Sequence, residues 1–164
     1  MTREEAGKDF KIFEQFNNQW ALATGGTPAQ FNCCTISWGS LGTLWGRPVA
    51  TVYINPDRYT WEFLKDSDTF TVSWFAPEYR EALAYLGEKS GRDEDKIKAV
   101  GLTPKELAGG VTFQEANLTF VCRKLYQGEF QREGLADKIN HGIYEHWRPH
   151  WMFVGEILEV EDKR

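Results

Sequence analysis

The sequence predicts a mainly β fold, an antiparallel β-barrel with peripheral helices, in a single domain over residues 1–164. Segments with strand character outnumber those with helical periodicity, and they are rich in β-branched and aromatic residues. Most connections between them are too short for the helical crossovers that parallel strands require. No repeat, low-complexity tract or linker interrupts the chain, so no domain boundary is expected.

The chain is expected to begin with a short helix and a strand. Aromatic residues at near-helical spacing predict a helix over residues 11–18. Residues 19–24 are predicted to form the first strand, because a turn signal containing two glycines and a proline follows at residues 25–28. Apolar runs at 31–38 and 48–54 predict two further strands, which are expected to pair with each other through a hairpin-like connection.

A helix is predicted after this pair. Asn55-Pro56-Asp57 is a helix-start signature, since it offers a capping side chain, a proline at the first position and an acid in the first turn. A helix that continues through Lys65 would place Tyr59 and Phe63 on one face. Residues 69–75 follow as the strongest strand signal in the chain, because they are almost entirely β-branched or aromatic.

The C-terminal half is predicted to contain two helices and two strands. Tyr79, Leu83 and Leu86 recur at helical spacing, and Gly87 supplies a stop. A second helix is expected over residues 93–100, again ending at a glycine. The remaining expected elements are a helical turn that begins at Thr103-Pro104 and strands over residues 116–125 and 151–160.

Composition restricts the possible functions. The chain is 41% hydrophobic and 26% charged, which is ordinary for a globular protein, but 15% of it is aromatic, including seven tryptophans. So many flat side chains indicate either a rigid core or a site for a flat ligand. The net charge of −5 argues against a general nucleic-acid or membrane surface, which would need a basic face, although a local cationic pocket stays compatible with it.

The cysteines and the N-terminus predict a cytoplasmic protein. Cys33, Cys34 and Cys122 are few, odd in number and partly adjacent, so they are expected to be small buried thiols without disulfides. The N-terminus is charged and does not resemble a signal peptide, and no apolar run approaches the 18 or so residues that a membrane span needs.

Three segments carry polar groups that an anionic ligand would need. Polar side chains interrupt the apolar strand 31–38, and Arg58 and Thr60 lie in the first turn of a helix, where free N–H groups favour an anion. Residues 90–96 add a serine and two cations. Each segment also has a simpler interpretation: solvent-facing strand hydroxyls, a solvated surface arginine, and a self-paired charge cluster. Taken singly, none of them identifies a ligand.

Taken together, the segments resemble a known family. The resemblance runs in order from about Trp20 to Val160 and rests on the motifs NCCTISWGSLGTLW, RPVATVYINPDRYTWEF, FTVSWF, SGRDEDK, GLTP, CRKLYQ and HWMFVGEI. In this order they are similar to the flavin reductase-like FMN-binding proteins, the flavoredoxin type in particular. The resemblance implies a split β-barrel, a homodimer, and FMN bound close to the subunit interface.

The resemblance also implies roles for individual residues. The FMN-binding positions that it implies are Asn32, Cys34, Thr35, Ile36, Ser37, Arg58, Tyr59, Thr60, Ser73, Phe75, Ser90, Lys96 and Ile97. Among them, Thr35 and Ser37 would supply hydroxyl and N–H contacts, and Arg58 and Thr60 would hold the phosphate.

Lys96 would be the second phosphate cation, while Ser73 and Phe75 would lie near the ring. His150 matches a histidine that in some relatives lies near the nicotinamide, so it is a candidate for positioning that ring. Cys34 stands where close relatives often carry methionine, a change that leaves the phosphate groups intact but alters the packing expected against the flavin.

Other candidate sites are weaker. The three histidines, His141, His146 and His150, are not expected to bind a metal, because Pro149 breaks their spacing and no acidic or thiol partner is evident. No nucleophile is evident that would complete a nucleophile–base pair with either of the potential bases, Glu115 and Glu156. Trp147 and Trp151 are expected to lie in the core or at a dimer interface rather than to stack sugars or bases.

Three functional hypotheses follow. The first is an oxidoreductase in which NAD(P)H reduces bound FMN and the flavin passes electrons to an acceptor that the sequence does not identify. The chain has no Rossmann glycine fingerprint, so a nicotinamide would bind against the flavin itself. The second is an FMN electron carrier that another protein reduces. The third is an aromatic-rich β-barrel binding module without flavin.

Overall fold

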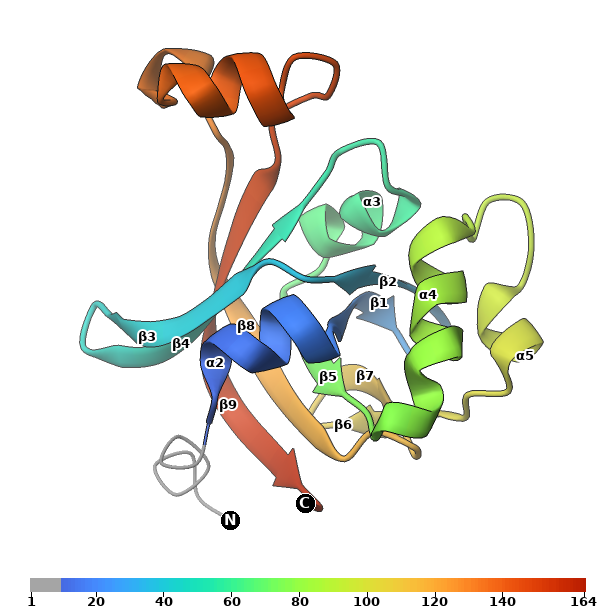
Figure 1. The fold of residues 1–164 in the computed structure, drawn as a ribbon. Coiled ribbons are helices and arrows are strands. Elements are labelled where there is room, and N and C mark those ends of the chain that lie inside the picture. The colour runs from blue at the N-terminus through green and yellow to red at the C-terminus, as the bar shows by residue number, and fades with distance from the viewer. Residues whose placement is uncertain (1–9) are drawn as a thin grey trace.

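Antiparallel strands dominate the computed structural model, which describes residues 10–164 (Figure 1). The strands of the main sheet are β1 (Ala21–Thr27), β2 (Gln30–Ile36), β3 (Gly39–Leu44), β4 (Arg47–Ile54), β5 (Thr69–Trp74), β8 (Leu118–Glu129) and β9 (Trp151–Asp162). Their order is β2-β1-β5-β8-β9-β4-β3, and every adjacent pair is antiparallel. A second, two-stranded sheet pairs β6 (Pro104–Leu107) with β7 (Gly110–Phe113). The predicted mainly β fold is therefore confirmed.

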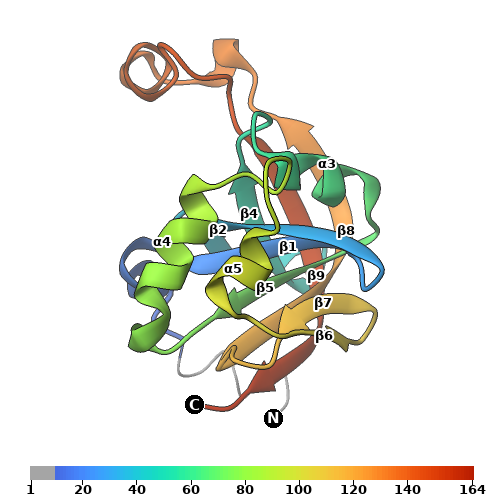
Figure 2. The same cartoon turned by 90° about the vertical axis from the view of Figure 1, so that its right-hand side faces the viewer.

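Short helices lie around the sheet. They are α2 (Ile12–Glu14), which continues into the π-helix η1 (Gln15–Gln19), α3 (Tyr59–Asp66), η2 (Pro77–Tyr79), α4 (Arg80–Glu88), α5 (Lys96–Val100), η3 (Arg132–Gly134) and η4 (Ile139–Ile143). Figure 2 shows α4 and α5 side by side, next to the strands β1 and β2. The segment that contains η3 and η4 projects away from the barrel between β8 and β9 (Figure 1). We call residues 130–149 the arm.

Two hydrophobic clusters hold the fold together. The larger one fills the barrel around Trp74, whose ring makes edge contacts with Phe10, Phe16 and Phe120 and whose indole N–H donates to the Gln15 carbonyl. The smaller one lies under α4 and α5 and contains Leu22, Phe75, Leu83, Leu86, Ile97 and Phe113. Amphipathic α4 therefore packs on the sheet through its apolar face, as the spacing of its leucines predicted.

A buried carboxylate joins three strands on the other side of the barrel. Glu156 on β9 is 8% exposed and accepts hydrogen bonds from Arg47 at 3.0 Å and from Arg123 at 2.7 Å. Both arginines hold the pKa of Glu156 below its usual value. Because the charge is paired on both sides, this candidate base is a structural residue of the sheet.

The predicted strand pairing was wrong in one place. Residues 31–38 do not pair with 48–54; β2 pairs instead with β1, and residues 39–44 form the additional strand β3, which pairs with β4. The two-residue turn between β3 and β4, Trp45-Gly46, has positive φ at both positions, as tight hairpins require. The turn predicted at residues 25–28 begins later than expected, because Gly25, Gly26 and Thr27 remain in β1.

Two element starts also differ from the prediction. Helix α3 begins at Tyr59, because the Asn55 side chain accepts from the Asp57 N–H and closes a turn ahead of the helix. The expected helical turn at Thr103-Pro104 is instead the start of strand β6. Tyr59 and Phe63 lie on one face of the helix, as expected, and their rings meet edge-on with centroids 4.9 Å apart.

In the part of the chain that the structure describes, no helix is long and apolar enough to cross a membrane. The expectation that the chain lacks a signal peptide rests on the N-terminus, and residues 1–9 lie outside the described residues.

Helix α3 packs so closely on β1 that a methyl group at Gly25 has no room. A Cβ there would lie 2.7 Å from the Leu64 backbone nitrogen and 2.9 Å from the Phe63 carbonyl carbon. We expect Gly25→Ala to lower the free energy of unfolding by about 1–3 kcal/mol, the usual range for overpacking. Urea unfolding measures this change. The matched control is Gly42→Ala on β3, where nothing lies within 4 Å, and a similar loss there would contradict the steric explanation.

Candidate functional site

Most of the residues predicted to bind phosphate meet at one small cavity. The cavity has a volume of about 90 Å³ and lies where β2, the start of α3 and the end of α4 converge. We call it the polar cavity. It is lined by Asn32, Cys34, Asp57, Arg58, Tyr59, Thr60, Glu88, Lys89, Ser90, Gly91 and Lys96. The structure thus brings together seven predicted positions from three separate segments.

The inner wall of the polar cavity is a buried hydrogen-bonded group. The Asn32 amide donates to the Thr60 hydroxyl at 3.1 Å, and both residues are almost completely buried. Burial raises the pKa of the Cys34 thiol, although a hydrogen bond from Thr60 opposes that shift. Cys34 is therefore a neutral thiol that contributes shape and packing rather than a reactive thiolate.

Two cations lie at the C-terminal end of α4. The Lys96 ammonium group, in a residue only 3% exposed, donates to the carbonyls of Leu86 at 2.9 Å and Lys89 at 3.1 Å. The guanidinium of Arg58 donates to the Gly87 carbonyl. These bonds satisfy carbonyls that a helix end leaves unpaired. An ammonium has three N–H donors and a guanidinium five, so both cations keep donors for a ligand.

Backbone and hydroxyl groups add further donors. The first turn of α3, at Tyr59 and Thr60, presents N–H groups and the positive end of the helix dipole to the polar cavity. The hydroxyl oxygen of Ser90 accepts from the Arg92 N–H, which leaves its own O–H to donate. Gly91 passes so close to Asn32 that a Cβ there would lie 2.5 Å from the Asn32 amide oxygen. The loop thus closes directly over the cavity wall.

A second cavity continues from the first and is largely aromatic. It has a volume of about 180 Å³ and shares Cys34 and Arg58 with the polar cavity. We call it the aromatic cavity. Its other lining residues are Thr35, Ile36, Ser37, Trp38, Tyr53, Ile54, Asn55, Trp147 and His150. The hydroxyl of Thr35 donates to the Leu83 carbonyl at 2.5 Å, so it fastens α4 to β2 and is not available as a donor to a ligand.

His150 is enclosed at one side of the aromatic cavity. Its ring lies 4.8 Å from that of Trp38 and 6.4 Å from that of Trp147, measured between centroids. Its Nδ1 is hydrogen-bonded to the Tyr144 hydroxyl at 3.0 Å. Burial and the nearby positive charge of Arg58 lower the pKa of His150 to about 4, so the ring is neutral near pH 7.

Two predicted ring contacts lie elsewhere. Ser73 is fully buried and shares hydrogen bonds with the hydroxyls of Thr112 and Thr119. Phe75 packs in the smaller core cluster under α4. Neither residue lines the polar or the aromatic cavity. Ser73 lies on β5, an interior strand of the sheet, and Phe75 directly follows that strand. Their expected place beside a ring stays a prediction, and these two cavities give it no support.

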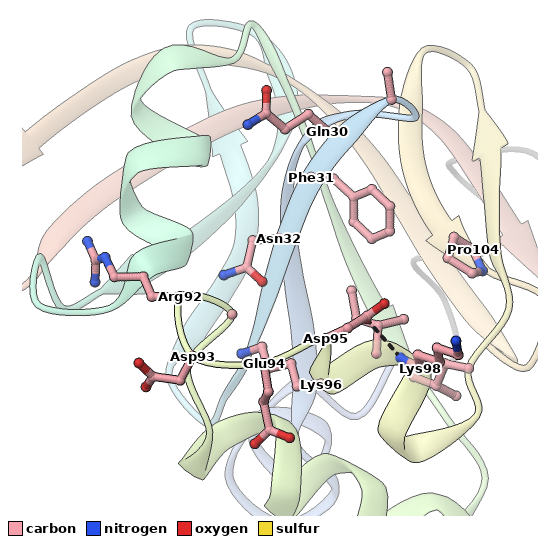
Figure 3. Close-up of a pocket in the computed structure, with 14 residues that line it drawn as sticks. Gln30, Phe31, Asn32, Arg92, Asp93, Glu94, Asp95, Lys96, Lys98 and Pro104 are labelled. Carbon is pink, nitrogen blue, oxygen red and sulfur yellow. Dashed lines mark hydrogen bonds between the residues drawn. The ribbon is translucent and has the colours of Figure 1, made fainter.

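The widest cleft adjoins the polar cavity through Asn32, Gly91 and Lys96 and has a volume of about 740 Å³. Figure 3 shows Asn32 and Phe31 on β2 along one wall and the segment from Arg92 to Lys98 along the other. The charges of that segment are mostly paired with protein groups. Arg92 pairs with Glu62, Glu94 accepts from Tyr85, and Asp95 caps the Lys98 N–H. Residues 92–95 are therefore not the self-paired cluster of the simpler interpretation, because the partners of Arg92, Glu94 and Asp95 lie outside that segment. Ile97 lines the cleft and packs in the core.

Sequence reasoning missed four aromatic residues of the site, among them Tyr53 in the wall of the aromatic cavity. Trp38 and Trp147 line the aromatic cavity and are 38% and 54% exposed, and Tyr144 holds His150. Trp151 packs against the larger core cluster, as expected, and meets Trp61 edge-on at 5.2 Å. Trp147 fell outside every predicted helix and strand, which was the only signal for it, whereas Trp38 ended a predicted strand.

The remaining candidates have structural surroundings. Glu115 accepts two hydrogen bonds from the Thr103 N–H. His141 and His146 belong to the arm and are exposed. Within residues 10–164, no three side chains of the kinds that ligate metals are grouped closely enough to hold an ion.

Comparison with known proteins identifies the family. A model described as the flavin reductase like domain matches residues 13–164. A flavoredoxin from Methanosarcina acetivorans is 22% identical with a TM-score of 0.68, covering 88% of this chain and 68% of its own. An FMN-binding protein from Thermus thermophilus, with bound 1-cyclohex-2-enone, is 21% identical with a TM-score of 0.71, covering 93% and 74%.

A flavoredoxin of Desulfovibrio vulgaris (Miyazaki F) is similar at 21% identity and a TM-score of 0.67, covering 87% of this chain and 68% of its own. The search of curated proteins returned no match. The family match extends over nearly the whole chain, and the solved structures share its fold, as the ordered motifs predicted. The chain belongs to the flavin reductase-like domain family.

Proposed function

We propose that this chain binds FMN and acts as an oxidoreductase that takes reducing equivalents from NAD(P)H. The observation that carries the proposal is the direct continuation of a cation-lined polar cavity into an aromatic one, through Cys34 and Arg58. FMN needs this combination, because it joins a dianionic phosphate to a wide, flat and mostly apolar ring.

The residues of the polar cavity fit a phosphate. Arg58 and Lys96 supply positive charge in a protein whose net charge is −5, and each keeps N–H donors beyond those used on α4. Thr60, Ser90 and the first-turn N–H groups of α3 add neutral donors. Lys96 and the first turn of α3 line the polar cavity but not the aromatic one, so we assign the phosphate to the polar cavity and the ring to the aromatic one.

Bound FMN would supply the hydride and electron transfer, so the protein need not provide an acid or a base. The residues of the protein would position the flavin ring and shield it from solvent. Trp38 and Trp147 give the aromatic cavity flat walls, and neutral His150 limits its charge. A nicotinamide would enter from the same side, because the chain lacks a separate dinucleotide fingerprint.

A non-enzymatic electron carrier is the second candidate function. It is favoured by the exposed aromatic residues at the mouth of the aromatic cavity, where Trp147 is 54% exposed. Electron transfer from a partner protein could occur across such a surface without nucleotide binding. We do not propose the flavin-free binding module, because the family to which the chain belongs handles flavin.

We also propose that the protein is a homodimer. Large apolar side chains are exposed on both projecting parts of the molecule, the β3–β4 hairpin and the arm (Figure 1). They are Leu44 and Trp45 on the hairpin and Ile143 and Trp147 on the arm. Apolar surface of this extent on a chain of 164 residues is typical of an interface.

Arg58→Gln should weaken FMN binding by about tenfold or more, since a charge-assisted hydrogen bond is worth roughly 1.5–3 kcal/mol. Riboflavin, which lacks the phosphate, should bind the variant and the wild-type protein equally. Quenching of flavin fluorescence measures both affinities. The control is Arg92→Gln, which removes the same charge from a neighbouring loop but pairs with Glu62 outside the polar cavity. Equal losses in both variants would refute a local phosphate contact.

Anaerobic addition of NADH or NADPH to the FMN-loaded protein should bleach the visible absorbance of the oxidised flavin, because the reduced flavin has lost it. Stopped-flow spectroscopy with each nucleotide separately gives the rate and its dependence on nucleotide concentration. If neither nucleotide bleaches a protein that is fully loaded with FMN, the carrier replaces the enzyme as the better function.

The homodimer should appear in light scattering as a mass of twice 18.9 kDa. Trp45→Ser, at the exposed tip of the hairpin, should shift the equilibrium toward monomer without unfolding the barrel. A concentration-independent monomeric mass for the wild-type protein would disprove the dimer.

A further inference from the structure

Tyr144 and His150 form a buried pair where the arm returns to the barrel. Tyr144 is 5% exposed and His150 8%, and the Tyr144 hydroxyl lies 3.0 Å from the His150 Nδ1. Their ring centroids are 5.6 Å apart. The backbone carbonyl of His150 also accepts from the Phe130 N–H, which fixes the two ends of the arm to each other. The imidazole is therefore held both by the Tyr144 side chain and by the backbone bond between Phe130 and His150.

The direction of the hydrogen bond between the two side chains follows from their chemistry. The Tyr144 hydroxyl and the His150 Nδ1 lie 3.0 Å apart, a distance that fits a donor on either side. Burial raises the pKa of Tyr144, so the hydroxyl proton is retained. A phenol O–H is a better donor than a neutral imidazole N–H, and an imidazole nitrogen is a better acceptor than a phenol oxygen. Tyr144 therefore donates to Nδ1 of His150.

This bond determines which nitrogen of His150 carries the ring proton. A neutral imidazole has one N–H, and Nδ1 is already an acceptor, so the proton lies on Nε2. No protein group among residues 10–164 pairs with Nε2, although His150 lines the aromatic cavity. The cavity thus contains a neutral N–H donor with a fixed direction and no protein acceptor.

We infer that the Nε2–H of His150 binds a carbonyl oxygen on an uncharged planar ligand, and that Tyr144 is the positioning residue that fixes this tautomer. An uncharged ligand fits because Trp38 and Trp147 form the adjacent walls and Arg58 repels a cation. An ionised acceptor would lose its hydration in this apolar setting. The identity of the ligand rests on the proposed function, which offers two sources, a ring carbonyl of the flavin and the carboxamide of a nicotinamide.

The tautomer is testable without any ligand. Nitrogen-15 NMR of the histidine rings near pH 7 should show His150 protonated on Nε2 and unprotonated on Nδ1. Tyr144→Phe should convert this signal to a mixture of tautomers, because the donor to Nδ1 is lost. A wild-type protein with the proton on Nδ1, or with a doubly protonated ring, would overturn the inference whatever the protein proves to bind.

The ligand contact is tested on the FMN-loaded protein. Tyr144→Phe should weaken the affinity for either FMN or NAD(P)H by roughly three- to tenfold, with a smaller change in the limiting rate of flavin reduction. A weaker affinity for FMN assigns the carbonyl to the flavin, and a weaker apparent affinity for NAD(P)H assigns it to the nicotinamide. The matched control is Tyr126→Phe, which removes the same hydroxyl from an exposed tyrosine of β8 that lines neither cavity and should change neither affinity.

His150→Leu provides a second variant, since it removes the donor itself and keeps the side chain apolar. It should reproduce the loss seen in Tyr144→Phe, and thermal unfolding of both variants checks that the arm is intact. Unchanged affinities in both folded variants would overturn the contact. If the wild-type protein binds no FMN at all, the proposed function fails and the carbonyl contact with it, while the NMR result still decides the role of Tyr144.

Discussion

The carbonyl groups at the end of α4 are the constraint on which the site depends. A helix that ends against a sheet leaves its last carbonyls without intrahelical partners, and burying them unpaired is costly. Here Lys96 and Arg58 supply the missing donors to Leu86, Gly87 and Lys89. Two cations from separate segments are thereby drawn to one point beside β2. The polar cavity is the space that remains between them.

The same contacts serve folding and binding at once. Lys96 is buried in a protein that is acidic as a whole, and a buried ammonium is tolerated only where carbonyls or an anion surround it. Two carbonyls accept from two of its three N–H donors, so the third N–H remains for a ligand. An anion in the polar cavity would complete the coordination that α4 begins. Binding and the packing of α4 should therefore reinforce each other.

The sequence was sufficient for most of the long helices and strands and for the polar cavity, but not for the additional strands β3 and β6 or for the aromatic cavity. Arg58, Thr60 and Lys96 occur in short local motifs whose geometry is fixed within one turn or loop. The pairing of β2 with β1 was missed because Gly25 and Gly26, which suggest a turn, remain in a strand. Long-range packing decides which face of a strand and which end of the arm meet the site. The periodicity of a single sequence carries no information about such packing.

The two cavities differ in how they are built, and this difference has a consequence for function. The polar cavity is formed by elements packed on the barrel, so a change there affects the stability of α3 and α4 as well. One side of the aromatic cavity is formed by Trp147 and His150, at the return of an arm that projects from the barrel (Figure 1). Substitutions in the arm can therefore reshape the ring side without disturbing the core. In a fold arranged in this way, the residues proposed to hold a phosphate can stay the same while the residues that meet a redox partner change.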